Sequence, residues 1–475
     1  MNAATKQFII EHINEDVSKL ALSAKRNAEV DVPFALQQIK ARQHARTKLP
    51  AWYENTEIVF PAQVSVEQSS SEQTALYKAT LIGKGIAGRA RNDKTTLLDL
   101  TGGMGVDTAF LSRKFAKTIY VERNADLCET AKHNFSVLGL HHINVENADA
   151  VDFLKKTETV DCIFIDPARR DVRGKKVAAF ADCEPNILEI LPALLQKSET
   201  VLIKTSPMLD ISQAVKELRN VAEIHVVAVE NECKELLFLL KKGFSDKTVV
   251  VAVNFPKNKP VQRFSFTFEE EKNAVCRFAE QPETYLYEPN VALLKAGAYK
   301  ILSEKFNIKK LHPNSHLYTS DVLCHCGLDP QPPFYTRHCG LDPQPPVYTR
   351  HCGLDPQPPE KGQDKKGIAG QARNDGKQLG IAGQARNDGY KKGIAGQARN
   401  DRAVTFQGRV FEVEETLRAT SLPKSIKQAN LAVRNFPETA ENLRRKLKIV
   451  DGGEVYLFAT TLSDGRKVVI KCRKL

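Results

Sequence analysis

The stretch Leu97-Leu-Asp-Leu-Thr-Gly-Gly-Met-Gly105 decides the fold of this 475-residue chain. Its apolar first half predicts a short buried strand, and its three glycines allow a sharp turn that brings the backbone close to a ligand. Residues 106–115 then place apolar side chains at helical spacing, which predicts a helix whose first amide groups face that ligand. This order is typical of a nucleotide-sized ligand site, although a tight turn without a ligand fits the same residues.

Three further apolar runs predict parallel strands that each end close to a carboxylate. The runs span residues 118–121, 143–145 and 160–165. Glu122 follows the first run and can accept hydrogen bonds from both hydroxyls of a ribose. Asp149 follows the second and can accept from an adenine amino group, and Asp166 follows the third. Because parallel strands end at one edge of a sheet, we expect these carboxylates beside the glycine loop.

A dinucleotide-binding fold also uses a glycine turn and an acid after the second strand, but two residues argue against it. The dinucleotide fingerprint starting at Gly103 requires a third glycine at position 108, where this chain has Thr108. Asp99 stands at the lip of the predicted loop, where a carboxylate disfavours phosphates. The pattern therefore favours a ligand that carries an ammonium group.

These residues resemble the loop of class I S-adenosylmethionine-dependent methyltransferases, which reads D-x-T/G-x-G-x-G and here begins at Asp99. Most of the chain also resembles bacterial methyltransferases with a C-terminal THUMP-like domain. The shared stretches are residues 99–107, 166–171, 231–237 and 411–415. The resemblance implies S-adenosylmethionine as the cofactor, with Asp99 and the glycines at its methionine part, Glu122 at the ribose and Asp149 at the adenine. The implied cofactor-binding residues are Asp99, Thr101, Gly102, Gly103, Gly105, Asp107, Glu122, Asp149 and Ala150.

The corner Asp166-Pro-Ala-Arg169 is the candidate acceptor site. In amino-group methyltransferases an Asp/Asn-Pro-Pro-aromatic tetrad accepts a hydrogen bond from the target nitrogen and stacks on its base. Here alanine and arginine replace the second proline and the aromatic residue. The expected catalytic residues are Asp166, as hydrogen-bond acceptor or base, together with Pro167 and Arg169, whose guanidinium can stack or bind a phosphate. Alternatively, Asp166 caps the following segment and Arg169 and Arg170 are solvated.

Helices and further strands are expected on either side of this region. Residues 6–25 and 33–48 predict two helices, the second with a basic end that either contacts phosphates or is a solvated face. The basic residues are Lys40, Arg42, His44, Arg46 and Lys48. The later strands are expected at residues 200–204, in an antiparallel pair at 224–229 and 236–240, and at 249–254.

Two short repeats, each with a 13-residue period, interrupt the chain. The first begins at His325, His338 and His351, the second at Gly367, Gly380 and Gly393, and a near copy of the second spans residues 85–93. His-Cys-Gly-Leu-Asp-Pro-Gln of the first repeat and Ala-Gly-Gln-Ala-Arg-Asn of the second can be read from opposite strands of one DNA element. We therefore interpret residues 324–401 as a repetitive DNA element translated in frame, forming a disordered loop.

The repeat also contains residues that can bind metals. They are Cys324, His325, Cys326, His338, Cys339, His351 and Cys352. Zinc sites use paired ligands that close one tetrahedron, which equal spacing on a proline-rich chain does not supply, so no metal is expected. The remaining cysteines are scattered, which indicates reduced thiols. With no signal peptide or membrane-spanning run in the sequence, we expect a cytoplasmic protein and no membrane partner.

Residues 423–475 form the electropositive part of the chain. They hold twelve Lys or Arg and five Asp or Glu, a net charge of +7 out of +12 for the whole chain. Residues 455–461 and 467–472 predict a hairpin with basic residues facing outward. This surface suits RNA phosphates, and the resemblance to THUMP-like proteins points the same way. A basic domain without an RNA partner fits the charge as well.

We therefore predict an α/β fold: a Rossmann-like class I methyltransferase sheet with an N-terminal helical region and small α+β C-terminal domains, interrupted by the disordered repeat insertion. The expected domains are a helical region at 1–82, a short repeat at 83–94, the methyltransferase domain at 95–256, a ferredoxin-like domain at 257–323 plus 402–415, the insertion at 324–401 and a THUMP-like domain at 416–475. The expected activity is methylation of a base in tRNA or rRNA. The alternatives are a protein or small-molecule methyltransferase and a catalytically silent RNA-binding protein.

Overall fold

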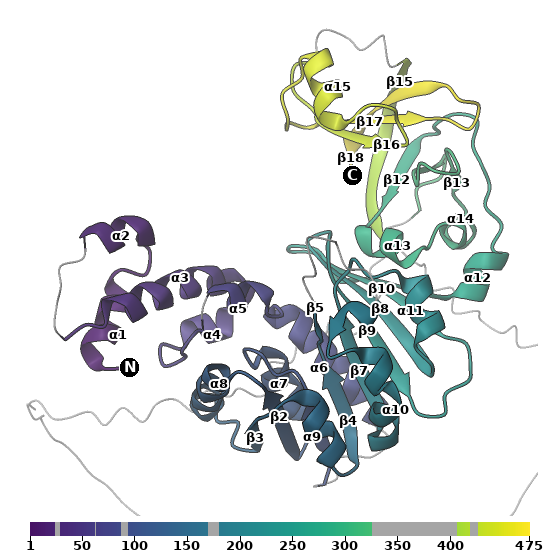
Figure 1. Ribbon diagram of the computed structural model, residues 1–475. Coiled ribbons are helices and arrows are strands. Elements are labelled where there is room, and N and C mark those ends of the chain that lie inside the picture. Colours follow the sequence, from purple (N-terminus) through teal and green to yellow (C-terminus); the bar gives the residue numbers. More distant parts are fainter. Residues whose placement is uncertain (24–28, 62, 87–93, 170–179, 325–405, 419–425) are drawn as a thin grey trace, which may run out of the picture. The chain divides into compact units, whose positions relative to one another are not determined.

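The computed structural model (Figure 1) describes residues 1–23, 29–61, 63–86, 94–169, 180–324, 406–418 and 426–475. Among these residues, the strands form a nine-stranded sheet, a seven-stranded sheet and a two-stranded sheet. The order of the nine-stranded sheet is β11-β10-β8-β9-β7-β4-β1-β2-β3. The glycine loop follows β1, so this sheet positions the candidate site.

Five parallel strands form the half of the large sheet that carries the loop. In spatial order they are β3 (Ile143–Asn147), β2 (Lys117–Glu122), β1 (Thr96–Asp99), β4 (Val160–Ile165) and β7 (Ser198–Thr205). The sequence predicted all five. The central strands β1 and β4 are buried on both faces, which explains why their sequences are continuously apolar rather than alternating.

The other half of the sheet contains the reversed strand that the sequence predicted. Strand β9 (Glu232–Lys241) runs antiparallel to both of its neighbours, β7 and β8 (Val221–Val229). Strand β10 (Val249–Phe255) pairs in parallel with β8, and β11 (Gln262–Thr267) closes the edge antiparallel to β10. This strand order confirms the predicted Rossmann-like class I methyltransferase sheet.

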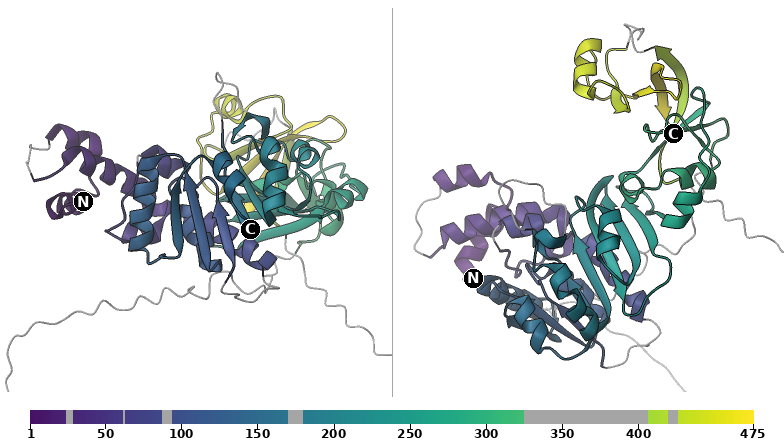
Figure 2. Two further views of the ribbon diagram at one scale, coloured as in Figure 1. Left: turned by 60° about the horizontal axis from the view of Figure 1, so that its bottom comes forward. Right: turned by 45° about the vertical axis from the view of Figure 1, so that its right-hand side comes forward.

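Helices cover both faces of the large sheet (Figures 1 and 2). On one face, Leu98 of β1 belongs to a hydrophobic cluster with α10 (Ile187–Lys197). Its neighbour Leu97 points to the other face and joins a cluster with α6 (Glu72–Ile86). The other elements around this sheet are α7 (Val106–Leu111), η1 (Ser112–Lys114), α8 (Ala125–Val137), α9 (Ala150–Lys156), η2 (Phe180–Asp182) and α11 (Ile211–Glu217).

The N-terminal region differs from its prediction at two points. The helices before α6 are α1 (Ala3–Glu11), α2 (Val17–Ser23), α3 (Val32–Lys48), α4 (Pro50–Glu54) and α5 (Gln63–Gln68). The prediction of a single helix over residues 6–25 is wrong. Asp16 accepts a hydrogen bond from the amide of Lys19 and thereby starts a second helix, α2. Arg42 is also not part of a solvated or phosphate-binding face. It is buried and donates to backbone carbonyls, including those of Thr56 and Ile58.

The seven-stranded sheet contains the end of the chain. Its order is β13 (Lys309–Lys310), β14 (Tyr318–Ser320), β12 (Tyr285–Pro289), β15 (Gly408–Arg418), β18 (Lys467–Lys474), β17 (Val455–Thr461) and β16 (Asn430–Arg434). The antiparallel β17–β18 pair confirms the predicted hairpin. The helices that follow β11 are α12 (Phe268–Asn273), α13 (Val291–Ala296), α14 (Lys300–Lys305) and α15 (Ala440–Leu447). Of these, α13 packs on β8, β9 and β10 of the large sheet.

The strands on either side of the repeat segment lie in this one sheet. Strand β14 precedes the segment and β15 follows it, and both pair with β12. The repeat itself lies in residues 325–405, outside the described residues, as does most of the short repeat at 83–94. The interpretation as a translated insertion therefore remains a prediction.

Replacing residues 325–405 by a short Gly/Ser linker is expected to leave the melting temperature unchanged within a few degrees. The reason is that β12 already joins the two flanking strands, so the sheet does not need the segment between them. Thermal unfolding of the full-length and shortened proteins measures this. Insoluble protein, or a melting temperature lower by ten degrees or so, would contradict the insertion hypothesis.

Candidate active site

A cleft of about 1300 Å³ lies at the edge of the sheet where β1, β2, β4 and β7 end. It brings together most of the residues that the sequence singled out. The predicted residues on its surface are Thr101, Gly102, Gly103, Gly105, Asp107, Glu122, Asp149, Ala150, Asp166 and Pro167. Asp99 does not line it, and the side chain of Arg169 lies outside what the structure describes.

The glycine loop is held against β2 by Tyr120. The hydroxyl of this buried side chain donates to the carbonyl of Gly103 at 2.5 Å. A Cβ atom at Gly102 would lie 2.1 Å from the Tyr120 ring, so no other residue fits there without a shift. Gly103 and Gly105 have φ values of +54° and +84°, which L-residues with side chains rarely adopt. Gly102 and Gly105 thus let the loop pack closely against the rings of Tyr120 and Phe135, and all three glycines line the cleft with backbone alone.

The sequence analysis expected Asp99 at the edge of the loop, facing the ligand. Asp99 instead lies beneath the loop and does not line the cleft. It is fully buried and accepts hydrogen bonds from the amide of Thr101 at 3.0 Å and the hydroxyl of Thr108 at 2.5 Å. Burial raises the pKa of Asp99 to about 7, although both hydrogen bonds lower it. Thr108, which argued against a dinucleotide fingerprint, thus has a defined role as the partner of Asp99.

Glu122 and Asp149, which the resemblance assigns to the ribose and the adenine, both line the cleft. The carboxylate of Glu122, at the end of β2, accepts from the amides of Gly103 and Asn124, both at 2.9 Å. Asp149 is exposed and caps α9 by accepting from the amides of Val151 and Asp152. Both residues are therefore in place for a ligand on the loop, and each also stabilises local backbone.

The predicted acceptor corner follows β4 on the opposite side of the loop. The amide of Asp166 donates to the hydroxyl oxygen of Thr101 at 2.7 Å, which ties the corner to the glycine loop. Pro167 is buried, and Ala168–Arg169 forms strand β5, paired with β6 (Cys183–Glu184). The side chain of Arg169 and all of Arg170 lie outside what the structure describes, so their predicted roles remain untested.

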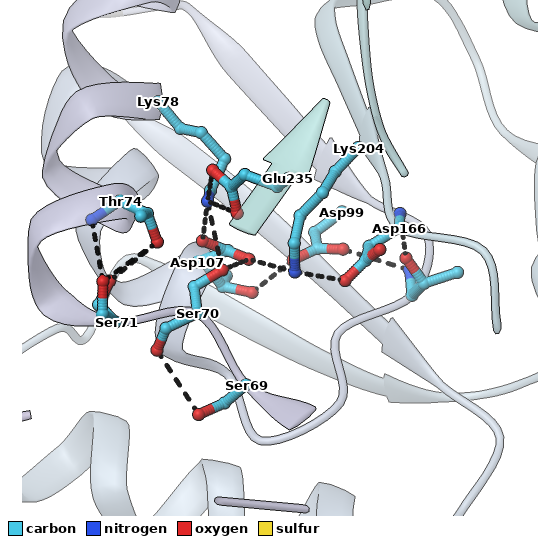
Figure 3. Close-up of polar contacts among 12 residues, drawn as sticks. Ser69, Ser70, Ser71, Thr74, Lys78, Asp99, Asp107, Asp166, Lys204 and Glu235 are labelled. Carbon is cyan, nitrogen blue, oxygen red and sulfur yellow. Dashed lines mark hydrogen bonds and ion pairs between the residues drawn. The ribbon is translucent and has the colours of Figure 1, made fainter. Parts of the chain in front are cut away.

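The carboxylate of Asp166 pairs with a lysine from another strand. Lys204, near the end of β7, places its ammonium 2.5 Å from Asp166 Oδ2 and 3.5 Å from Asp107 Oδ2 (Figure 3). Lys204 is only 8% exposed. Burial alone would lower its pKa, but the carboxylates of Asp166 and Asp107 outweigh that effect, so the pKa of Lys204 is raised and the side chain is a cation.

Asp107 links Lys204 to a second buried lysine. Lys78 of α6 is fully buried and lies 3.1 Å from Asp107 Oδ1 and 2.7 Å from Glu235 Oε1. The hydroxyl of Ser70 donates to Asp107 Oδ2 at 2.7 Å and accepts from Lys78 at 3.1 Å. Burial opposes the charged form of Asp107, but the two lysines overcome this and its pKa is lowered. We call Ser70, Lys78, Asp107, Asp166, Lys204 and Glu235 the charged network.

Sequence reasoning missed four residues of the charged network, namely Ser70, Lys78, Lys204 and Glu235. Lys204 is the last residue of the run 200–204, which was predicted only to be a strand. A lysine at the end of a buried strand needs a carboxylate partner, and this signal was overlooked. Glu235 lies in the stretch 231–237 that carried the family resemblance. Lys78 gave no comparable signal, because a lysine on a helix is usually solvated.

Two further expectations concern metals and membranes. Among the described residues, no group of three or more His, Cys, Asp or Glu is arranged to hold a metal ion. The repeat residues weighed as metal ligands lie outside the described chain, apart from Cys324. No helix in the described part of the chain has the length and hydropathy to cross a membrane.

The fold and the cleft define a class of protein. A Rossmann-like sheet in which β9 is reversed between β7 and β8, a glycine loop after β1 and carboxylates after the next strands are features of class I methyltransferases. The family model described as conserved hypothetical protein 95 matches residues 86–228, a ferredoxin-like domain model matches 285–325, and a THUMP domain-like model matches 408–474. The chain is thus related to class I methyltransferases with a THUMP-like domain, which confirms the resemblance seen in the sequence.

One solved structure matches almost the whole chain. It is a protein of Porphyromonas gingivalis W83, provisionally described as a methyltransferase, with 28% identity and a TM-score of 0.72, covering 99% of this chain and 97% of that chain. An rRNA methylase from Streptococcus thermophilus has 15% identity and a TM-score of 0.26, covering 34% and 96%. TrmK from M. capricolum, in complex with S-adenosyl-homocysteine, has 16% identity and a TM-score of 0.26, covering 35% and 69%. A search of curated proteins finds no match.

Asp99 is expected to make the stability of the protein depend on pH. Because its folded-state pKa of about 7 lies above the ordinary 3.8, the folded state binds more protons than the unfolded chain between these values. The free energy of unfolding should therefore fall as the pH rises from about 4 to about 7, by up to about 1.4 kcal/mol for each pKa unit.

Asp99→Asn removes this titration and keeps an acceptor for the amide of Thr101. Its free energy of unfolding should lose that part of the pH dependence, which chemical denaturation of both proteins across this pH range measures. Identical pH profiles for the two proteins would show that Asp99 does not titrate there.

Proposed function

We propose that this protein is an S-adenosylmethionine-dependent methyltransferase that acts on RNA. The observation that carries the proposal is one cleft in which the bare backbone of the glycine loop lies between Glu122 and Asp149 on one side and Asp166 with Lys204 on the other. The first group suits the cofactor and the second suits an acceptor. Methyl transfer requires these two ligands to be held in line, which a shared cleft provides.

The residues present fit S-adenosylmethionine. Gly102, Gly103 and Gly105 offer backbone without side chains for the methionine part, and Glu122 lies where ribose hydroxyls can donate to it. Leu127 and Val151 add apolar surface near Asp149, which suits an adenine ring. When bound, the cofactor supplies an electrophilic methyl group. The chain itself orients the acceptor and accepts its proton.

The C-terminal sheet supports RNA as the acceptor. The matched THUMP-like residues 408–474 overlap the electropositive part of the chain. Basic side chains of this domain form ion pairs at its surface, such as the exposed pair of Arg466 with Asp464. Exposed pairs contribute only about 0–1 kcal/mol, so phosphates can replace the acidic partners. This favours binding that depends on salt more than on RNA sequence.

Asp166→Ala is expected to reduce transfer of labelled methyl from S-adenosylmethionine to total cellular RNA at least about 100-fold, because it removes the hydrogen-bond acceptor or base at the acceptor. The RNA should come from a strain without this gene, so that acceptor sites are free. Label that withstands RNase would identify a protein or small-molecule acceptor instead. RNA binding that is equal in both proteins, without methyl transfer by either, would identify a catalytically silent RNA-binding protein.

Glu122→Gln is expected to raise the Kd for S-adenosylmethionine about tenfold or more, since a hydrogen bond to a charged group contributes about 1.5–3 kcal/mol. Glu129→Gln is the matched control, because Glu129 is exposed on α8 and does not line the cleft. Calorimetric titration measures both constants. Equal affinities for the two variants would remove Glu122 from the cofactor site.

A further inference from the structure

The acceptor side of the cleft contains a close pair of opposite charges. The Lys204 ammonium and the Asp166 carboxylate are hydrogen-bonded, and both side chains line the cleft. Figure 3 shows Lys204 reaching from β7 to a point between Asp166 and Asp107. Any acceptor atom that approaches Asp166 therefore also approaches a fixed cation.

A fixed cation has opposite effects on the two common acceptor atoms in RNA. When a neutral amine attacks a methyl group, its nitrogen gains positive charge, which a nearby ammonium destabilises. When a hydroxyl attacks and gives up its proton, its oxygen gains negative charge, which the same ammonium stabilises. Because Lys204 is mostly buried, these charge effects are stronger there than in bulk water. Lys204 therefore favours an oxygen acceptor.

The lining of the cleft points in the same direction. Methylation of a base needs its ring to be held flat, and proteins usually stack unpaired bases on aromatic side chains. Phe164 is the single aromatic residue among the described residues that line the cleft, and it is only 1% exposed. Among the described residues that line the cleft, no exposed aromatic ring is therefore available to stack on a base.

We propose that Asp166 and Lys204 together select a ribose 2′-hydroxyl of RNA as the methyl acceptor, rather than a base nitrogen. This inference rests on the proposed function. The hydroxyl oxygen forms a bond to the methyl carbon as the bond from that carbon to the sulfonium sulfur breaks. The hydroxyl proton passes to the Asp166 carboxylate, and the products are a 2′-O-methyl ribose and S-adenosylhomocysteine. Lys204 stabilises the negative charge that develops on the oxygen.

The charged network explains how Lys204 is kept in place as a cation. Asp107 faces it from α7, Asp166 from the end of β4, and Glu235 adds negative charge from β9. Lys78 neutralises part of this negative charge behind Asp107 and is fully shielded from the cleft. Lys78, Asp107 and Glu235 are thus positioning residues, whereas Asp166 and Lys204 touch the acceptor.

The direct test is the chemical position of the methyl group. Wild-type protein labels RNA from a strain without the gene, and the RNA is then hydrolysed with alkali, which cannot cleave next to a 2′-O-methyl ribose. Label in alkali-resistant dinucleotides is the expected result. Label in single nucleotides with a methylated base would overturn this inference and leave the proposed function intact. No label in RNA would overturn both.

Substitution of Lys204 gives a second, independent test. Lys204→Met should lower kcat at least about 100-fold with little change in the Kd for S-adenosylmethionine, and Lys204→Arg should restore part of the activity because it keeps the positive charge. Lys242→Met is the control, since Lys242 forms an exposed ion pair with Glu199 outside the cleft. Unchanged or increased kcat in folded Lys204→Met would contradict the inference. If Lys204→Met does not fold, the alkali test on wild-type protein decides.

Discussion

The candidate site depends on the pairing of Asp107 with two buried lysines. A buried charge without a partner is strongly destabilising, and removing one member of such a pair costs about 3–5 kcal/mol. Lys78 comes from α6 and Lys204 from β7, so one carboxylate fixes a helix and a strand that are far apart in sequence. Ser70 adds the segment before α6 to the same cluster. One face of the cleft is thereby fixed by electrostatics rather than by apolar packing alone.

The glycine loop connects this charged network to the cofactor side. Tyr120 supports the loop from β2, Asp99 holds it from below, and Thr101 accepts a hydrogen bond from the amide of Asp166. A shift of the loop would therefore also move the acceptor corner. Methyl transfer depends on alignment of two ligands to within a fraction of an ångström, so a direct link between their two sites is what the proposed reaction requires.

The sequence was sufficient to predict the large sheet and most of the cleft. Continuous apolar runs identify strands that are buried on both faces, and the residues after them must share one edge, so the positions of Glu122, Asp149 and Asp166 followed from β2, β3 and β4. The roles of Asp99 and Lys204 did not. Whether a carboxylate points into a cleft or under a loop, and which lysine reaches it across the sheet, depends on tertiary contacts that periodicity does not encode.

The errors in the N-terminal region have the same origin. The apolar spacing over residues 6–25 fits one helix, but the hydrogen bond from the Lys19 amide to Asp16 starts a second one. Arg42 was assigned to a basic surface from its neighbours, whereas it supports the loop after α4 through backbone carbonyls, such as that of Asn55. In both cases a local polar contact determines the structure, and such contacts are the least visible in a single sequence.

A crystal structure with bound S-adenosylhomocysteine would show whether this cleft is the methyltransferase site. We expect this ligand to lie on the glycine loop, with its ribose hydroxyls within hydrogen-bonding distance of Glu122 and its adenine beside Asp149, while Asp166 and Lys204 remain paired and open to an acceptor. A ligand bound elsewhere, or a protein that does not bind it at all, would contradict the assignment of this cleft.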